Sequence, residues 1–120
     1  MANILAVDDS ASMRQMVTHT LKENGHSVVD APDGKAALDK AKQQKFDAVI
    51  TDVNMPNMDG ITLIRELRKL PNYRFTPLLL LTTESAPEKK QEGKSAGATG
   101  WLVKPFDPEK LMGAVRKVIR

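Results

Sequence analysis

Residues 3–10 read NILAVDDS, a run of four apolar side chains that leads directly into two acids and a serine. An apolar run without polar alternation is typical of a strand buried on both faces, as in a parallel sheet covered by helices. Residues 48–50 (AVI) and 78–81 (LLLL) have the same character. The three runs predict an α/β domain with a buried parallel sheet.

The rest of the chain alternates strand-like and helix-like segments. The predicted strands are residues 3–7, 27–31, 48–51, 78–82 and 101–103. Apolar residues recur with helical spacing between and after them, as in the stripe of Met13, Met16, Val17, Thr20 and Leu21. Residues 85–96 also read as a helix, but Gly93 interrupts them and large apolar side chains are nearly absent, so we expect the least anchored element there.

This alternation, with short connections, predicts right-handed β-α-β units in one domain over residues 1–120. The expected architecture is a doubly wound (βα)5 fold with a five-stranded parallel sheet of order 2-1-3-4-5. Asn24-Gly25 and Leu70-Pro71 are typical helix stops, and Asp33-Gly34 is a typical helix start.

Composition excludes several classes of function. The chain has no cysteine, which rules out disulfides, thiol nucleophiles and cysteine–zinc sites, and two histidines, His19 and His26, cannot build a histidine-rich metal centre. No apolar run approaches the ~20 residues of a membrane span, and no signal sequence is visible, so we expect a cytoplasmic domain. The net charge is +3, but the basic residues are dispersed and aromatics make up only 4%, so no nucleic-acid partner is expected.

Polar residues follow the predicted strands, where ligands bind in open α/β sheets. They are Asp8, Asp9 and Ser10 after the first strand, Asp52 and Asn54 after the third, Thr82 at the end of the fourth and Lys104 after the fifth. Each has a simpler interpretation: Asp9 or Ser10 could cap a helix, Thr82 could end a strand, and Lys104 could be a solvated loop charge. Asp59 is interpreted only as a turn or cap residue.

The simpler interpretations do not explain three acids at one edge of the sheet. Like charges at about 5 Å repel by about 1 kcal/mol even in a water-like dielectric, so the cluster predicts a divalent cation. Oxygen ligands favour Mg²⁺, for which Mn²⁺ can substitute, and Mg²⁺ commonly shares its coordination with phosphate oxygens. Asp52, on the central strand, is the best candidate for a carboxylate nucleophile that forms an acyl phosphate, with Lys104 and Thr82 contacting the transferred group.

Asp8-Asp9-Ser10, residues 52–60 (DVNMPNMDG), Thr82 and residues 104–106 (KPF) together resemble the receiver domain of two-component response regulators. The resemblance covers the whole chain in order and spacing, and it is strongest to the stand-alone chemotaxis (CheY-like) type with a flavodoxin-like fold. It implies that Asp52 accepts a phosphoryl group from a histidine kinase. It also implies that Asp9, Asp52 and the Asn54 carbonyl coordinate Mg²⁺ directly, with Asp8 acting through water, and that the Lys104-Pro105 peptide is cis.

The resemblance also implies how phosphorylation is read out. Thr82 would move toward the phosphoryl group and Trp101, the switch aromatic, would enter the space it leaves, changing the surface of the fourth helix, fifth strand and fifth helix. Asn54 and Glu84 occupy the positions that tune dephosphorylation, and this pair predicts a phosphorylated state that lasts seconds to minutes. The protein is expected to be a monomer and a phosphoacceptor rather than an enzyme.

The output partner stays open. Residues 86–88 (APE) precede Lys89-Lys90, and Trp101 replaces the tyrosine of motor-binding members. Both departures argue against flagellar switch binding and leave open a phosphate sink or a partner other than the motor. An aspartyl-phosphate phosphatase of the haloacid-dehalogenase type is less favoured, because Asn54 stands where that chemistry needs a second acid. A flavodoxin-like cofactor carrier is disfavoured because Asp8-Asp9 would repel its phosphate.

Overall fold

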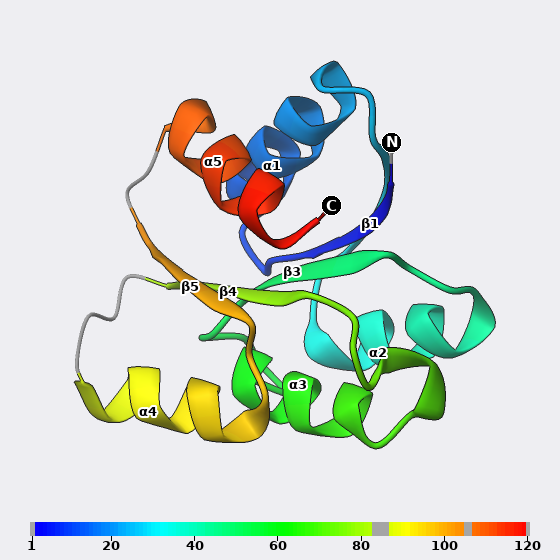
Figure 1. Cartoon of the computed structure of the whole chain (residues 1–120), viewed down its shortest axis with the longest axis vertical. Coiled ribbons are helices and arrows are strands. Elements are labelled where there is room, and N and C mark those ends of the chain that lie inside the picture. Colours follow the sequence, from blue (N-terminus) through cyan, green and yellow to red (C-terminus); the bar gives the residue numbers. More distant parts are fainter. Residues whose placement is uncertain (1, 83–86, 105–106, 120) are drawn as a thin grey trace.

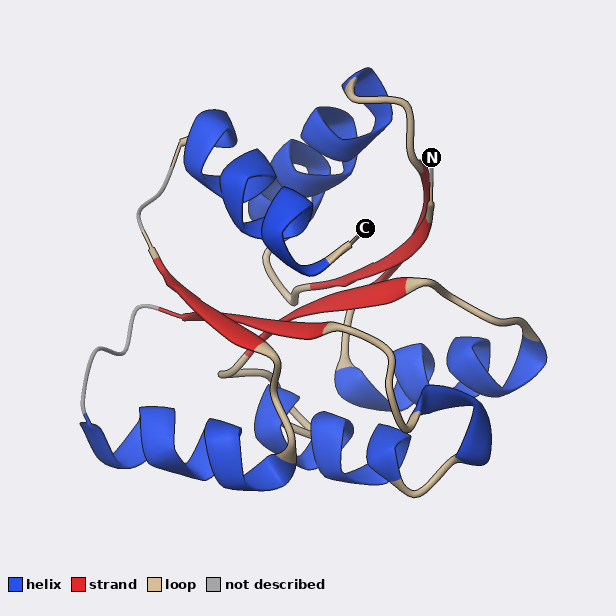
Figure 2. Cartoon of the chain, viewed as in Figure 1, coloured by secondary structure: helices blue, strands red, loops and turns tan. Residues whose placement is uncertain are grey.

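The described residues, 2–82, 87–104 and 107–119 of a computed structural model, form one parallel sheet of five strands in the order β2-β1-β3-β4-β5 (Figures 1 and 2). The strands are β1 (Asn3–Val7), β2 (Ser27–Ala31), β3 (Ala48–Asp52), β4 (Leu78–Thr82) and β5 (Gly100–Val103). The predicted fold and strand order are confirmed. Two boundaries differ by one residue, because Asp52 pairs with Leu81 and Gly100 pairs with Leu79 in the ladders.

Helices cover both faces of the sheet, α1 and α5 on one and α2, α3 and α4 on the other (Figure 1). Their bounds are α1 (Ala11–Glu23), α2 (Gly34–Gln43), α3 (Gly60–Arg68), α4 (Pro87–Ala96) and α5 (Pro108–Val118). The predicted helix of residues 85–96 is described from Pro87 onward, and residues 85 and 86 lie outside the described part. Within the described residues, no helix has the length and apolar content to cross a bilayer.

Side-chain caps start α1, α2 and α3 where the sequence indicated. Ser10 accepts a hydrogen bond from the Met13 N–H at the start of α1, and Asp33 and Asp59 cap α2 and α3 in the same way. The interpretation of Asp59 as a cap residue is therefore confirmed. At the first stop signal, α1 ends at Glu23 and Gly25 follows with φ +88°, a conformation that glycine adopts without strain.

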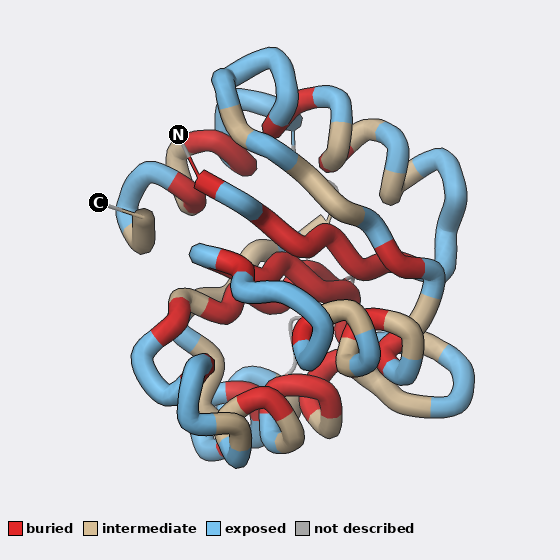
Figure 3. Tube along the Cα trace, turned by 90° about the vertical axis from the view of Figure 1, so that its right-hand side faces the viewer, coloured by how far each residue is buried: buried red, intermediate tan, exposed pale blue. Residues whose placement is uncertain are grey.

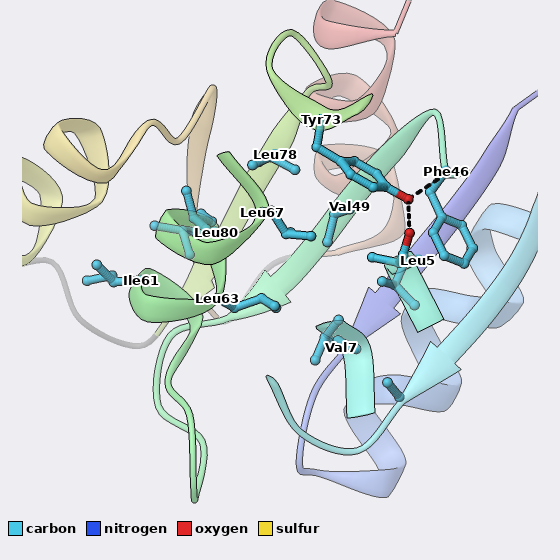
Figure 4. Close-up of a cluster of buried hydrophobic side chains, with 14 of the residues drawn as sticks. Leu5, Val7, Phe46, Val49, Ile61, Leu63, Leu67, Tyr73, Leu78 and Leu80 are labelled. Atoms are coloured by element: carbon cyan, nitrogen blue, oxygen red, sulfur yellow. Dashed lines mark hydrogen bonds between the residues drawn. The ribbon is translucent and has the colours of Figure 1, made fainter. Parts of the chain in front are cut away.

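The three apolar runs form the centre of the molecule: β3 and β4 are buried throughout, and β1 is buried after Asn3. Figure 3 shows the buried residues gathered along the sheet and the exposed ones on the outer helices and loops. One cluster of buried side chains fills the α2–α3 side, including Leu5, Val49 and Leu80 (Figure 4), and a second lies beneath α1 and α5.

A 3-10 turn, η1 (Pro71–Tyr73), follows α3 where the sequence indicated only a helix end. It places the Tyr73 ring in the core, where the hydroxyl accepts from the Phe46 N–H at 3.2 Å (Figure 4). The hydroxyl also donates to the Ala41 and Gln44 carbonyls at 2.8 Å each. This turn joins α2, α3 and the segment just before β3 at the amino ends of the strands, opposite the end where the acids lie.

Candidate functional site

The carboxyl ends of the parallel strands bring the three predicted acids together. Asp8 and Asp9 follow β1, and Asp52 is the last residue of β3, the neighbouring strand. Each of the three offers one carboxylate oxygen, and these oxygens lie within 4.8 Å of one another. Asp8 and Asp52 are buried, with exposed fractions of 2% and 7%, whereas Asp9 is exposed. Two acids of the cluster are therefore shielded from solvent, and Asp9 is open to it.

Lys104 lies in the same cluster, although it is far from the acids in sequence. Its Nζ is 3.1 Å from Asp8 Oδ2 and 3.5 Å from Asp52 Oδ1, and only 11% of its side chain is exposed. The Lys104 N–H donates to the Thr82 carbonyl at 2.7 Å, which continues the β4–β5 ladder by one residue beyond Val103. The interpretation of Lys104 as a solvated loop charge is wrong, because both of its partners are buried.

Backbone and arginine contacts fix the two buried acids. Asp8 Oδ1 accepts from the Ser10 N–H at 2.9 Å, so the turn that caps α1 also holds this carboxylate. Arg14, on the first turns of α1, donates to the Asp8 carbonyl at 2.8 Å. Asp52 Oδ1 accepts from the Val53 N–H at 2.9 Å. The carboxylates are thus held in place by the elements that flank them.

The electrostatics of the cluster are unbalanced. Three carboxylates face one ammonium, which leaves two excess negative charges when all the groups are ionised. Burial raises the pKa of the Asp52 carboxyl; Lys104 lowers it, Asp8 raises it further and the Val53 N–H lowers it, and the net direction is upward. Hard oxygen donors with an excess of two negative charges suit a divalent cation such as Mg²⁺.

The loop after Asp52 is held close to the site by a glycine. A Cβ added to Gly60 would overlap the Asp52 carbonyl oxygen, so the start of α3 approaches the end of β3 more closely than any other residue allows. The Gly60 N–H also donates to the Val53 carbonyl at 2.9 Å. Gly60 was not among the predicted site residues; its position after the Asp59 cap is the signal that could have singled it out.

The structure also locates the predicted switch and tuning residues that it describes. Thr82 is fully buried at the end of β4 and pairs in register with Val103. Trp101, two residues before Val103, is partly buried and packs against the α2–α3 side of the core. Asn54 is exposed in the loop after β3. Glu84 and the predicted cis Lys104-Pro105 peptide fall on or next to residues outside the described part.

Comparison with known proteins places the chain in one family. Residues 4–116 match the model of the response regulator receiver domain, so the chain belongs to the response regulator receiver family. It is similar to the chemotaxis protein CheY-3 of Vibrio cholerae, with 38% identity over 116 residues that cover 96% of this chain and 89% of that protein. It is also 35% identical over 120 residues to the response regulator ArlR of Staphylococcus epidermidis, covering all of this chain but 53% of ArlR. The chain thus spans about half the length of that relative.

Solved structures agree with this assignment. The chemotaxis response regulator CheY4 of Vibrio cholerae is 57% identical, with a TM-score of 0.95 and 98% of each chain covered. The receiver domain of the sensor histidine kinase PA1611 from Pseudomonas aeruginosa is 29% identical, with a TM-score of 0.91, covering 98% of this chain and 97% of that one; its structure has a magnesium ion coordinated in the active-site cleft. The expected similarity to CheY-like receivers is confirmed.

Proposed function

We propose that this receiver domain, spanning residues 1–120, accepts a phosphoryl group on Asp52 from the phosphohistidine of a sensor histidine kinase, in a reaction that depends on Mg²⁺. The convergence of Asp8, Asp9, Asp52 and Lys104 at one end of the sheet carries this proposal. Asp52 is the proposed acceptor because it ends the central strand and its carboxylate lies near both the other acids and the Lys104 ammonium.

The acidic residues hold the cation. Asp9 and Asp52 would bind it directly together with the Asn54 carbonyl, and Asp8 would act through water. When bound, Mg²⁺ neutralises the two excess negative charges, keeps Asp52 ionised and draws charge from the phosphoryl oxygens. The magnesium ion in the related PA1611 receiver supports this assignment, and so does the all-oxygen donor set of the present cluster.

The transfer itself requires only the positioning of groups. An Asp52 carboxylate oxygen forms a bond to phosphorus while the phosphorus–nitrogen bond to the kinase histidine breaks, and the bonding electron pair stays on the imidazole nitrogen. The Lys104 ammonium, already directed at Asp8 and Asp52, would pair with a phosphoryl oxygen, and the Thr82 hydroxyl would donate to another. The chain is then a phosphoacceptor that assists its own modification and loses the group by hydrolysis.

The proposed output depends on Thr82 and Trp101. A phosphoryl group adds a charge of about −1.5 to −2, which draws the Thr82 hydroxyl toward it and lets the Trp101 side chain change position. The surface of α4, β5 and α5 then presents a new face to an output partner. Similarity to CheY4 and CheY-3 supports a role in chemotaxis signalling. A phosphate sink that engages no motor is the second candidate, because Trp101 stands where the resemblance to motor-binding members implies a tyrosine.

The test is incubation with a small acyl phosphate and Mg²⁺, followed by intact mass measurement. The protein should gain about 80 Da, the mass of one phosphoryl unit, and the gain should vanish in Asp52→Asn and after chelation of the metal. Asp39→Asn, which changes an exposed acid on α2, is the matched control and should behave as the wild type. Equal gain in Asp52→Asn would reject the acceptor. A half-life of many hours would reject the tuning by Asn54 and Glu84.

A further inference from the structure

Helix α4 has unusually few side chains to hold it on the sheet. Its sequence, PEKKQEGKSA, contains no large apolar residue, and Ala96 is its one core member among the described residues. In other elements, such as α3, large aliphatic side chains fill the space between helix and sheet. The attachment of α4 must therefore come from close backbone approach rather than from interdigitated side chains.

Gly93 provides that approach. A Cβ added to Gly93 would lie 2.6 Å from Leu80 Cδ1 and 3.1 Å and 3.4 Å from Trp101 Cζ3 and Cε3. Contacts below 3.0 Å force a neighbour to move, and Leu80 is fully buried in the core, so it has little room to give. Because Gly93 has no side chain, α4 can lie close to Leu80 and to the six-membered ring of Trp101.

Hydrogen bonds hold the C-terminal end of α4 in place, so the helix cannot readily move away from the Trp101 ring. Arg68, at the end of α3, donates from Nε and Nη2 to the Gly97 carbonyl at 3.0 Å and 2.7 Å. The same guanidinium donates from Nη1 to the Tyr73 and Thr76 carbonyls at 2.6 Å and 2.8 Å, which joins α4's C-terminal side to η1 and the start of β4. The Arg68 hydrogen bonds therefore fix the C-terminal end of α4 relative to α3 and the sheet.

The Trp101 ring is held in this place without a hydrogen bond from its nitrogen. Nε1 is buried, and none of the described residues accepts a hydrogen bond from it. A buried donor without an acceptor disfavours the position it occupies, so packing against α4 and Leu80 holds the ring there. A second position in which Nε1 reached an acceptor or water would remove this cost.

We infer that Gly93 is a positioning residue for the Trp101 switch: its lack of a side chain seats the ring beneath α4, and ring movement is passed to the helix through this contact. The inference rests on the proposed function, in which Trp101 responds to phosphorylation of Asp52. Gly93 touches neither the cation site nor the transferred group, and the phosphorylation reaction does not depend on it.

The test compares two glycine-to-alanine changes in the middle of helices. Gly93→Ala places a methyl group against Leu80 and Trp101, whereas a Cβ at Gly113 of α5 meets nothing within 4 Å. Trp101 is the single tryptophan of the chain, so intrinsic fluorescence reports on it alone. Before phosphorylation, Gly93→Ala should shift the emission to longer wavelength and increase quenching by acrylamide, because the ring is displaced toward water. Gly113→Ala should keep the wild-type spectrum and quenching.

Acyl phosphate and Mg²⁺ then test the coupling. Gly93→Ala should gain the same mass as the wild type, but the phosphorylation-induced changes in Trp101 fluorescence and in amide exchange of α4 should be lost. Wild-type emission and quenching in unphosphorylated Gly93→Ala would overturn the inference. So would an unchanged response to phosphorylation. A wild-type protein that gains mass without any change in Trp101 fluorescence would instead reject the switch role of Trp101 in the proposed function. The comparison of unphosphorylated Gly93→Ala with the wild type would still decide whether Gly93 positions the ring.

If Gly93→Ala folds poorly, the same change is tested in the Trp101→Ala variant. If the ring is what limits the space, Trp101→Ala also opens room into which the Leu80 side chain can turn. Gly93→Ala in that background should then fold and should unfold at the same or a higher urea midpoint than Trp101→Ala alone, since alanine favours the helix. A loss of stability in that background as well would assign the need for glycine to Leu80 and overturn the inference.

Discussion

Lys104 is the residue whose removal tests the electrostatics of the site most directly. Lys104→Met keeps the length and apolar body of the side chain and removes the ammonium that faces Asp8 and Asp52. At the observed 3.5 Å between Nζ and Asp52 Oδ1, Coulomb attraction is about 1.2 kcal/mol for a dielectric constant of about 80 and about 4.7 kcal/mol for about 20. Both groups are nearly buried, so we expect a loss of about 3 kcal/mol in the free energy of unfolding, the size found when one partner leaves a buried pair.

The loss should depend on pH and on the metal. Without Lys104 the two buried carboxylates repel each other unopposed, so the cost is largest near neutral pH and shrinks in acid, where Asp52 binds a proton. Mg²⁺ should bind Lys104→Met more tightly than the wild type, because the ammonium no longer repels the cation. Urea unfolding in chelator, repeated at several pH values, measures the first effect, and a Mg²⁺ titration measures the second.

Lys69→Met is the matched control. It removes the same charge from an ion pair with Glu66 at 3.0 Å, but the lysine side chain is 70% exposed, and such surface pairs contribute about 0–1 kcal/mol. If Lys104→Met and Lys69→Met lower the free energy of unfolding equally, or if the Lys104→Met deficit is the same at acidic and neutral pH, the reasoning about the buried cluster is refuted.

Two other changes test the site and its scaffold. The folded state binds the Asp52 proton more tightly than the unfolded chain, so in chelator this group adds stability below its ordinary pKa of 3.8 that is lost as the pH rises through its raised folded pKa. Asp52→Asn should lack that decline, and pH profiles of the unfolding free energy that run parallel for variant and wild type would contradict it. Tyr73→Phe leaves the Phe46 N–H and two carbonyls without their partner and should cost about 1–3 kcal/mol, measured as a lower urea midpoint at constant m-value; an unchanged midpoint would show that the hydroxyl network contributes nothing.

The sequence alone was enough to predict the sheet and the edge at which the acids meet. The runs at residues 4–7, 48–50 and 78–81 have no polar alternation, and a strand of this kind is stable only where both faces are covered. Once the strands are parallel, their carboxyl ends lie at one edge, so Asp8 and Asp52 had to approach each other. Local side-chain chemistry likewise predicted the start of a helix at Asp33 and the cap role of Asp59. A cap is predictable from sequence because its side chain binds a backbone N–H only three residues away.

Only the tertiary structure decided how the neighbouring groups at that edge differ. Asp8 and Asp9 are adjacent in sequence, yet Asp8 is buried and Asp9 is exposed, because the turn into α1 directs the first inward and the second outward. The pairing of Lys104 with Asp8 crosses 96 residues of chain, and the ties from Arg68 to Gly97 and from Tyr73 to Ala41 join different elements. Sequence periodicity reports which face of an element is buried; it carries no information about which distant partner lies against that face, and that depends on how all the layers pack.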